Sequence, residues 1–249
     1  MVPSGFPGLN LYTAAMTDAA SEPARSLDAA ALFAELAAAS NDPALAEISC
    51  RVGPSLDCVD ALFAEERGAI ERAIPKRQRE FATARTYART LLADRGLTPG
   101  PIPSDEHRAP RWPESVVGSI SHTDALVWVA VCETRSGIRG LGIDVEQRHR
   151  LPSELHDKLF VASELEAVAK GGDDFATWLF SAKEAIYKAT RPLAGAFIGF
   201  TEAECTMSSD GTFTVRYLGD HAPSGVMNQG RGYVRQDAEH VYALFMIQH

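Results

Sequence analysis

The pattern of apolar and polar residues predicts helices in the first part of the chain. An alanine-rich stretch at 27–45 carries a few larger apolar residues, which predicts a short helix bounded by Pro43. From 67 to 95, strong helix formers carry apolar residues at helical spacing, which predicts a longer helix with one buried face. Gly96 and Pro99 end this helix.

Stretches rich in β-branched residues then alternate with helical ones. The predicted strands are 116–122, 125–132, 139–146, 212–217 and 241–247, and the first two are expected to form a hairpin. The predicted helices are 153–170 and 174–190, the second opened by an Asp cap. This order indicates an α+β fold, and because helix followed by strands occurs on either side of Glu146, it also indicates two similar halves.

The expected domain organisation follows from these elements. Residues 1–26 mix Pro, Gly, Ser and Ala with little periodicity, so we expect a flexible leader. The N-terminal half is expected to cover 27–146, with a helix rich in arginine, and the C-terminal half 147–249. A basic helix in an acidic protein can bind an anion, but it can equally be a solvated face.

Composition narrows the classes of function. The net charge of -9 disfavours a non-specific nucleic-acid binder, which needs excess Lys and Arg to displace counterions from phosphate. The four cysteines form no C-x-x-C pair, so we expect them to be reduced. The sequence contains neither a long apolar run nor a secretory signal pattern, which predicts a cytoplasmic protein without a membrane contact.

The first candidate for chemistry is the sequence Gly-Ile-Asp-Val-Glu at 142–146. In a strand, Ile143 and Val145 would face the core, and Asp144 and Glu146 would share the opposite face about 7 Å apart at Cα. Magnesium is typically held by one or two carboxylates together with substrate phosphates, which suits this pair. An acidic strand end exposed on the surface would give the same pattern.

Two further segments carry candidate residues. On the helix 174–190, Glu184 and Lys188 lie away from the apolar face, either as a stabilising i,i+4 pair or as a base beside a phosphate-binding amine. At 118–123, Gly-Ser-Ile-Ser-His-Thr is interpreted as a small-residue turn that could approach an anion. Its His122 could add a switchable charge or be a structural residue.

Taken in order, these motifs resemble a known family. The sequence S-x-S-H, then G-I-D-V-E, then W-x-F-S-A-K-E-A-x-Y-K is similar to the larger, monomeric class of 4′-phosphopantetheinyl transferases, of the surfactin and enterobactin type, and closest to actinobacterial members. The upstream sequence K-R-Q-R-E-F at 76–81 and P-R-W-P at 110–113 extend the resemblance, which covers about 65–200.

The resemblance implies a fold and a reaction. The fold would be a pseudo-twofold monomer of two similar α/β halves, with antiparallel sheets and a cleft between them. The enzyme would be a holo-acyl-carrier-protein synthase that transfers 4′-phosphopantetheine from coenzyme A to a serine of apo acyl or peptidyl carrier proteins and releases 3′,5′-ADP. Such carriers belong to polyketide, nonribosomal-peptide and siderophore synthases. Magnesium would be required, and manganese could replace it.

The resemblance also implies roles for individual residues. Asp144, Glu146 and Glu184 would bind the metal, and Glu184 could be the base toward the carrier serine instead of, or in addition to, binding the metal. Lys188 would neutralise or protonate the leaving phosphate. The residues implied to bind coenzyme A are Arg77, Arg85, Arg108, Ser121, His122, Lys183 and Lys188. Of these, Arg108 is expected to substitute for a lysine that family members carry before the Pro-Trp pair.

Two other functions fit part of the pattern. The three carboxylates could position water, which would make the protein a different metal-dependent phosphotransferase or hydrolase. A non-catalytic module that binds carrier proteins could keep the same fold. Such a module is expected to lose a metal carboxylate or a helix lysine, and here Asp144, Glu146, Glu184, Lys183 and Lys188 are all present.

Overall fold

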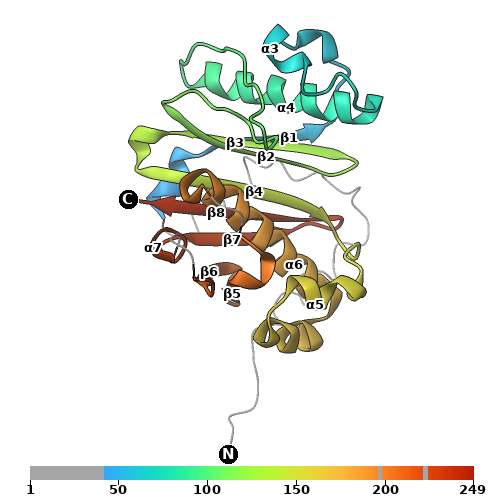
Figure 1. The fold of residues 1–249 in the computed structure, drawn as a ribbon, viewed down its shortest axis with the longest axis vertical. Helices are drawn as coiled ribbons and strands as arrows, with labels where there is room; N and C mark the ends of the chain where they lie inside the picture. Colours follow the sequence, from blue (N-terminus) through green and yellow to red (C-terminus); the bar gives the residue numbers. More distant parts are fainter. Residues whose placement is uncertain (1–41, 196–197, 221–223) are drawn as a thin grey trace, which may run out of the picture.

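The computed structural model (Figure 1) describes residues 42–195, 198–220 and 224–249. The predicted leader at 1–26 and most of the predicted helix at 27–45 lie outside the described residues. The described chain begins with the 3-10 helix η1 (Pro43–Glu47), in which Asp42 caps the N–H of Ala44. Across the described ranges, none of the helices combines the length and the apolar character that crossing a membrane requires.

The first unit is a three-stranded antiparallel sheet covered by one helix (Figure 1). Its strand order is β1 (Ser49–Pro54), β3 (Leu126–Glu133) and β2 (Val116–His122). The helix α4 (Pro75–Asp94) packs on the valines at alternate positions of β3. The predicted strand 116–122 is confirmed, and its hairpin partner is displaced by one residue from the predicted 125–132.

The predicted helix at 67–95 is wrong at its start. A short helix, α3 (Ala64–Arg67), ends before Gly68, and α4 begins only at Pro75. Proline is favoured in the first turn of a helix, and it holds the preceding Ile74 in an extended conformation, so the helix cannot continue backwards through it. The run of helix formers between the two segments forms turns instead.

The second unit is a five-stranded antiparallel sheet with the order β4-β8-β7-β6-β5. Its strands are β4 (Ile138–Gln147), β5 (Ala203–Met207), β6 (Thr212–Tyr217), β7 (Arg231–Gln236) and β8 (His240–Gln248). The short elements around both sheets are η2 (Val59–Ala61), η3 (Thr134–Ser136), η4 (Ser153–Leu155), α5 (His156–Leu159), η5 (Phe200–Glu202) and α7 (Ser224–Met227). Strand β4, which we expected in the N-terminal half, pairs with β8 and therefore belongs to the C-terminal sheet.

One long helix, α6 (Ala162–Ala194), covers the five-stranded sheet. It contains the second half of the predicted helix 153–170 and all of the predicted helix 174–190. The backbone of Gly172 is non-helical, with φ 73° and ψ -167°, so the helix is interrupted near the predicted gap between them. The first predicted helix begins too early, because η4 and α5 occupy 153–159.

The two sheets face each other, with a helix on each outer face. Trp128 of β3, Ile143 of β4 and Leu244 of β8 belong to one apolar core shared by the two sheets. At one side of this core β2 runs beside β4, where two serine hydroxyls accept hydrogen bonds from the backbone of β4. The α+β class with antiparallel sheets is therefore confirmed, whereas a pseudo-twofold relation between the units remains a prediction.

The packing of α6 on β4 depends on a glycine. An added Cβ at Gly142 would lie 1.8 Å from the backbone oxygen of Ala185, so only a residue without a side chain allows the helix to approach this closely. The helix contributes fully buried alanines to the contact, including Ala182, Ala185 and Ala189. This close approach places Lys188 directly over the strand that carries Asp144.

Candidate functional site

A cavity of about 560 Å³ lies between the two units and is lined by residues of both. The first unit contributes residues from the start of α4 and from the β2–β3 turn, and the second contributes the end of β4, the loop after it and part of α6. The charged lining residues are Lys76, Arg77, Glu80, His122, Asp124, Glu146 and Arg150. Cations and carboxylates therefore meet in one cavity.

Asp144 lies buried beside this cavity, with 2% of its surface exposed. Its alternation with Ile143 and Val145 is as predicted, but α6 covers its face of the strand, so a solvent-facing acidic strand is excluded. Lys188 Nζ lies 2.6 Å from Asp144 Oδ1, and the Ser121 hydroxyl donates to the same oxygen at 2.9 Å. The other oxygen, Oδ2, is buried without a hydrogen-bond partner among the described residues.

The Ser-x-Ser-His segment is part of strand β2, so the interpretation of 118–123 as a small-residue turn is wrong. Because side chains alternate along a strand, Ser119 and Ser121 point to β4, and their hydroxyls accept hydrogen bonds from the N–H groups of Ile143 and Val145 at 3.1 and 3.2 Å. Ser121, expected to bind coenzyme A, therefore connects β2 to Asp144.

Glu146 and Glu184 are half-buried carboxylates in the same electrostatic environment. The pKa of Glu146 is raised to about 7, mainly by burial; the negative charges of Asp144 and Glu184 add to this rise, and Lys188 and Arg150 oppose it. Burial also raises the pKa of Glu184. The positive charge of Lys188 opposes this rise, and the negative charge of Asp144 adds to it. Glu184 lines a second, smaller cavity of about 100 Å³ beside Tyr187 and Phe200.

These observations bear on whether Asp144 and Glu146 fit a metal ion. Nowhere in the described chain do three or more His, Cys, Asp or Glu residues form a ready metal-binding cluster. The unpartnered Oδ2 of Asp144 and the raised pKa of Glu146 nevertheless leave two carboxylates without a full countercharge. A magnesium ion that takes two carboxylates and completes its shell with phosphate oxygens and water fits this pair. Glu184 as a third ligand remains a prediction.

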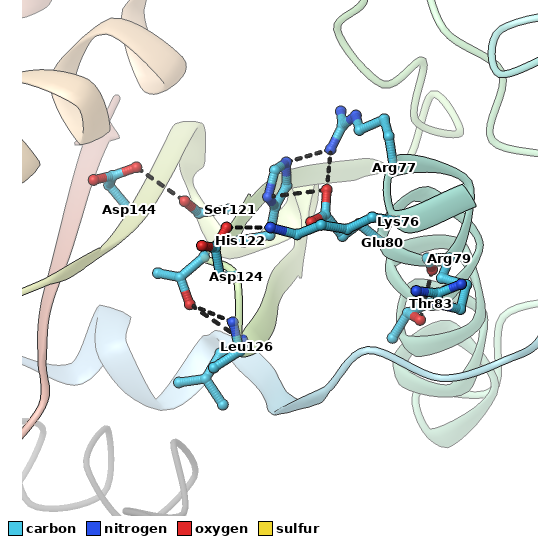
Figure 2. A network of polar contacts seen from close by, with 12 residues as sticks. Lys76, Arg77, Arg79, Glu80, Thr83, Ser121, His122, Asp124, Leu126 and Asp144 are labelled. Atoms are coloured by element: carbon cyan, nitrogen blue, oxygen red, sulfur yellow. Dashed lines mark hydrogen bonds and ion pairs between the residues drawn. The ribbon is translucent and has the colours of Figure 1, made fainter. Parts of the chain in front are cut away.

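Arg77 and His122 also line this cavity, and Figure 2 shows the contact between them. Arg77 at the start of α4 hydrogen-bonds to His122 Nε2, and both residues lie against the carboxylate of Glu80. The structure thus brings together two of the predicted phosphate ligands, which are 45 residues apart in the sequence. Of the predicted arginines, Arg77 is the one that lines this cavity.

Asp124 and Arg150 line this cavity, and neither was predicted as a site residue. Asp124, in the turn after β2, contacts Lys76 of the first unit and the Arg150 side chain of the second, the latter at 3.1 Å (Figure 2 shows the Lys76 contact). Arg150 follows β4 in a loop, where neither periodicity nor a motif marks it. The contact across the two units could not be inferred from sequence, because it depends on how the sheets pack.

Lys183, another predicted coenzyme A ligand, lies away from this cavity. Lys183 is buried, and its amine contacts Glu164 at 2.7 Å and the backbone oxygens of Phe200 and Ala203 at 2.7 and 2.6 Å. Its neighbour Glu164 also accepts hydrogen bonds from Val161 and Cys205, so this ion pair joins α6 to β5. These contacts are structural, and the expected contact of Lys183 with coenzyme A remains a prediction.

Arg85 is also buried, which lowers its pKa to about 10. Its guanidinium stacks on Phe81 and donates to the Ile102 carbonyl and the Ser104 hydroxyl, so it holds the proline-rich loop. Arg108 is exposed in that loop and has a positive φ of 68°. Neither arginine lines the cavity of about 560 Å³.

Cations of the kind that hold phosphate and carboxylates of the kind that hold a metal meet around this cavity, and sequence comparison supplies the family. Residues 65–132 match the family described as 4′-phosphopantetheinyl transferase N-terminal domain, and residues 140–243 match the 4′-phosphopantetheinyl transferase superfamily. The chain is 40% identical to the 4′-phosphopantetheinyl transferase Svp of Streptomyces mobaraensis, over 65% of this chain and 68% of Svp. The protein therefore belongs to the 4′-phosphopantetheinyl transferase superfamily, and it is an enzyme, as predicted.

Other relatives and solved structures are more distant. The chain is 36% identical to the 4′-phosphopantetheinyl transferase PptT of Mycobacterium tuberculosis, over 62% of this chain and 69% of PptT. Among solved structures, the holo-[acyl-carrier-protein] synthase of Thermotoga maritima matches with a TM-score of 0.38 and 25% identity, over 45% of this chain and 64% of that one. With a TM-score below 0.5, this match defines neither the fold nor the ligand of this chain.

Proposed function

We propose that this protein transfers 4′-phosphopantetheine from coenzyme A to a serine of an apo carrier protein. In this reaction the serine Oγ forms a bond to the phosphorus that carries pantetheine, and the bond from that phosphorus to the bridging oxygen breaks. The leaving group is 3′,5′-ADP, and the serine proton passes to a base. The magnesium requirement, with manganese as a substitute, belongs to the same proposal.

The observation that carries this proposal is the shared cavity. Arg77 and His122 stand on one wall of it and Glu146 on another, within a volume that suits a nucleotide-sized ligand. Arginine and imidazolium bind phosphate through charge-assisted hydrogen bonds. Coenzyme A carries a 3′-phosphate and a 5′-diphosphate on one ribose, so a single ligand can present phosphate groups to both walls.

Asp144 and Glu146 would hold magnesium in this proposal, and the ion, when bound, would neutralise charge on the diphosphate. The chain itself contributes Lys188, whose Nζ is already fixed by Asp144 and by the Ser121 hydroxyl at 3.1 Å. An ammonium group held there can stabilise the negative charge that develops on the leaving phosphate. Phosphoryl transfer needs mainly such alignment and neutralisation.

Glu184 is proposed as the base that accepts the serine proton. A base works best when its pKa lies near the operating pH, and burial raises the pKa of Glu184 from that of a free carboxylate. Its position in the small cavity beside Tyr187 and Phe200 gives the carrier serine an approach separate from the coenzyme A cavity. The charge of Glu184 also acts on Glu146, which lines the coenzyme A cavity.

The partners in this proposal are carrier proteins or carrier domains of synthases, and the enzyme acts as a cytoplasmic monomer. Mass spectrometry of a panel of apo carrier proteins, incubated with the enzyme, magnesium and coenzyme A, tests it. A gain of about 340 Da on a serine is expected, because the phosphopantetheine group becomes attached to that nucleophile. Breakdown of coenzyme A at the same rate without any carrier would instead identify a hydrolase.

A further inference from the structure

Glu80 is an acidic residue in the part of the cavity lining where Arg77 and His122 are proposed to bind phosphate. It lies on α4 in the lining of the cavity, and only 6% of its side chain is exposed. A buried negative charge repels an anionic ligand and is costly without partners. Its carboxylate oxygen Oε2 lies 3.3 Å from the Arg77 guanidinium and 3.5 Å from His122 Nδ1 (Figure 2). Glu80 therefore contacts both proposed phosphate ligands at once.

The contacts around His122 favour one tautomer of the neutral imidazole. An arginine can only donate, so the contact from Arg77 requires His122 Nε2 to accept. The imidazole then carries its proton on Nδ1, the nitrogen that faces Glu80. Arg77 and His122 are thus paired with each other.

Charges from three elements act on His122. Burial lowers the pKa of its imidazole, and Arg77 of α4 and Lys188 of α6 lower it further. Glu80 of α4 and Asp144 of β4 act in the opposite direction. Asp144 is already paired with Lys188, so Glu80 is the carboxylate in contact with the ring that can stabilise an added proton.

We propose that Glu80 is a positioning residue that holds Arg77 and His122 ready for the 3′-phosphate of coenzyme A. When that phosphate enters, Arg77 turns a donor from the imidazole to a phosphate oxygen, and His122 Nε2 takes a proton from solvent and donates it to the phosphate as well. Glu80 stabilises the resulting imidazolium through Nδ1–H. This inference rests on the proposed function.

Calorimetric binding of coenzyme A and of dephospho-coenzyme A, which lacks the 3′-phosphate, tests the proposal. For Glu80→Gln we expect coenzyme A to bind about tenfold more weakly, the size expected for losing one charge-assisted interaction, and dephospho-coenzyme A to bind as before. Asp94→Asn, an exposed acid at the end of the same helix, is the matched control and should bind both ligands as the wild type does. Equal weakening of both ligands, or of neither, would overturn the proposal.

Proton uptake by the wild-type enzyme on ligand binding provides a second test, which does not require any variant to fold. In buffers of different ionisation enthalpy, coenzyme A binding near neutral pH should take up a proton, and dephospho-coenzyme A binding should take up less. Identical proton uptake for the two ligands would contradict the role of His122. If the wild type modifies carrier proteins but Glu80→Gln binds normally, this inference alone fails; absence of coenzyme A binding would contradict the proposed function itself.

Discussion

The Ser121 hydroxyl donates a hydrogen bond to Asp144 Oδ1 at 2.9 Å and accepts one from the backbone N–H of Val145 at 3.2 Å. Through these contacts a strand of the first unit fixes a carboxylate of the second. Because Lys188 Nζ also lies 3.1 Å from the same hydroxyl, strand β2 positions both Asp144 and Lys188. The proposed metal ligand thus depends on contact between the two units.

Replacing Ser121 by alanine should therefore impair metal use more than folding. We expect Ser121→Ala to raise the magnesium concentration for half-maximal transfer about tenfold, the range typical when a group that orients a metal ligand is removed. Ser119→Ala is the matched control, because Ser119 accepts the N–H of Ile143 in the same way but does not contact Asp144. Both variants should lose about 1 kcal/mol of stability. Equal magnesium requirements in the two would refute the role of Ser121.

Gly142 should tolerate no side chain. An added Cβ would lie 1.8 Å from the backbone oxygen of Ala185, which cannot move without displacing α6. Gly142→Ala is expected to reduce the free energy of unfolding by about 3 kcal/mol, at the upper end of the usual cost of overpacking. Gly68→Ala, where an added Cβ meets nothing within 4 Å, should unfold as the wild type does. Denaturant unfolding of both proteins checks this, and wild-type stability of Gly142→Ala would contradict the packing.

Replacing Lys183 distinguishes a structural role of this lysine from a role in binding phosphate. Removing one partner of a buried ion pair is strongly destabilising, so Lys183→Met should lose about 3–5 kcal/mol of stability through the unpaired Glu164. The folded fraction should bind coenzyme A with unchanged affinity. Lys170→Met, at an exposed position of α6, controls for the loss of a lysine. A large loss of coenzyme A affinity at wild-type stability would restore Lys183 as a diphosphate ligand.

Glu184 should matter for turnover rather than for binding. Glu184→Gln is expected to reduce the rate of carrier modification by about 10²- to 10⁴-fold, the usual contribution of a general base. Its affinity for coenzyme A and its unfolding midpoint should stay close to those of the wild type. Glu166→Gln, an exposed glutamate on the same helix, is the control. Near-normal turnover of Glu184→Gln would mean that another group accepts the serine proton.

The sequence allowed much of the fold to be predicted where the pattern is local. The β-branched run at 116–122 and the alternation at 212–217 match β2 and β6 residue for residue. The helix start at Pro75 was missed because the preceding residues are themselves strong helix formers, and the proline outweighs them. The pairing of β4 with β8 could not be predicted, because it joins residues about 100 positions apart.

The site could be predicted only in part, because tertiary packing also decides which side chains reach it. Asp144, Lys188 and His122 were found because motifs mark them, but a motif does not say what a side chain contacts. Lys183 lies on α6 and Arg85 on α4, the helices that carry the motifs, but both side chains point into the protein. There Lys183 pairs with Glu164, and Arg85 donates a hydrogen bond to the backbone carbonyl of Ile102. Asp124 and Arg150 reach the cavity from loops, and loop positions follow from tertiary packing.

Parallel measurement of carrier mass and 3′,5′-ADP in one reaction tests the central claim most directly. With apo carrier protein, coenzyme A and magnesium, the account predicts one 3′,5′-ADP released for each carrier that gains about 340 Da on serine, as expected for transfer to a nucleophile. Both products should disappear when the metal is chelated. Release of 3′,5′-ADP without a change in carrier mass, or an unmodified carrier across the whole panel, would contradict it.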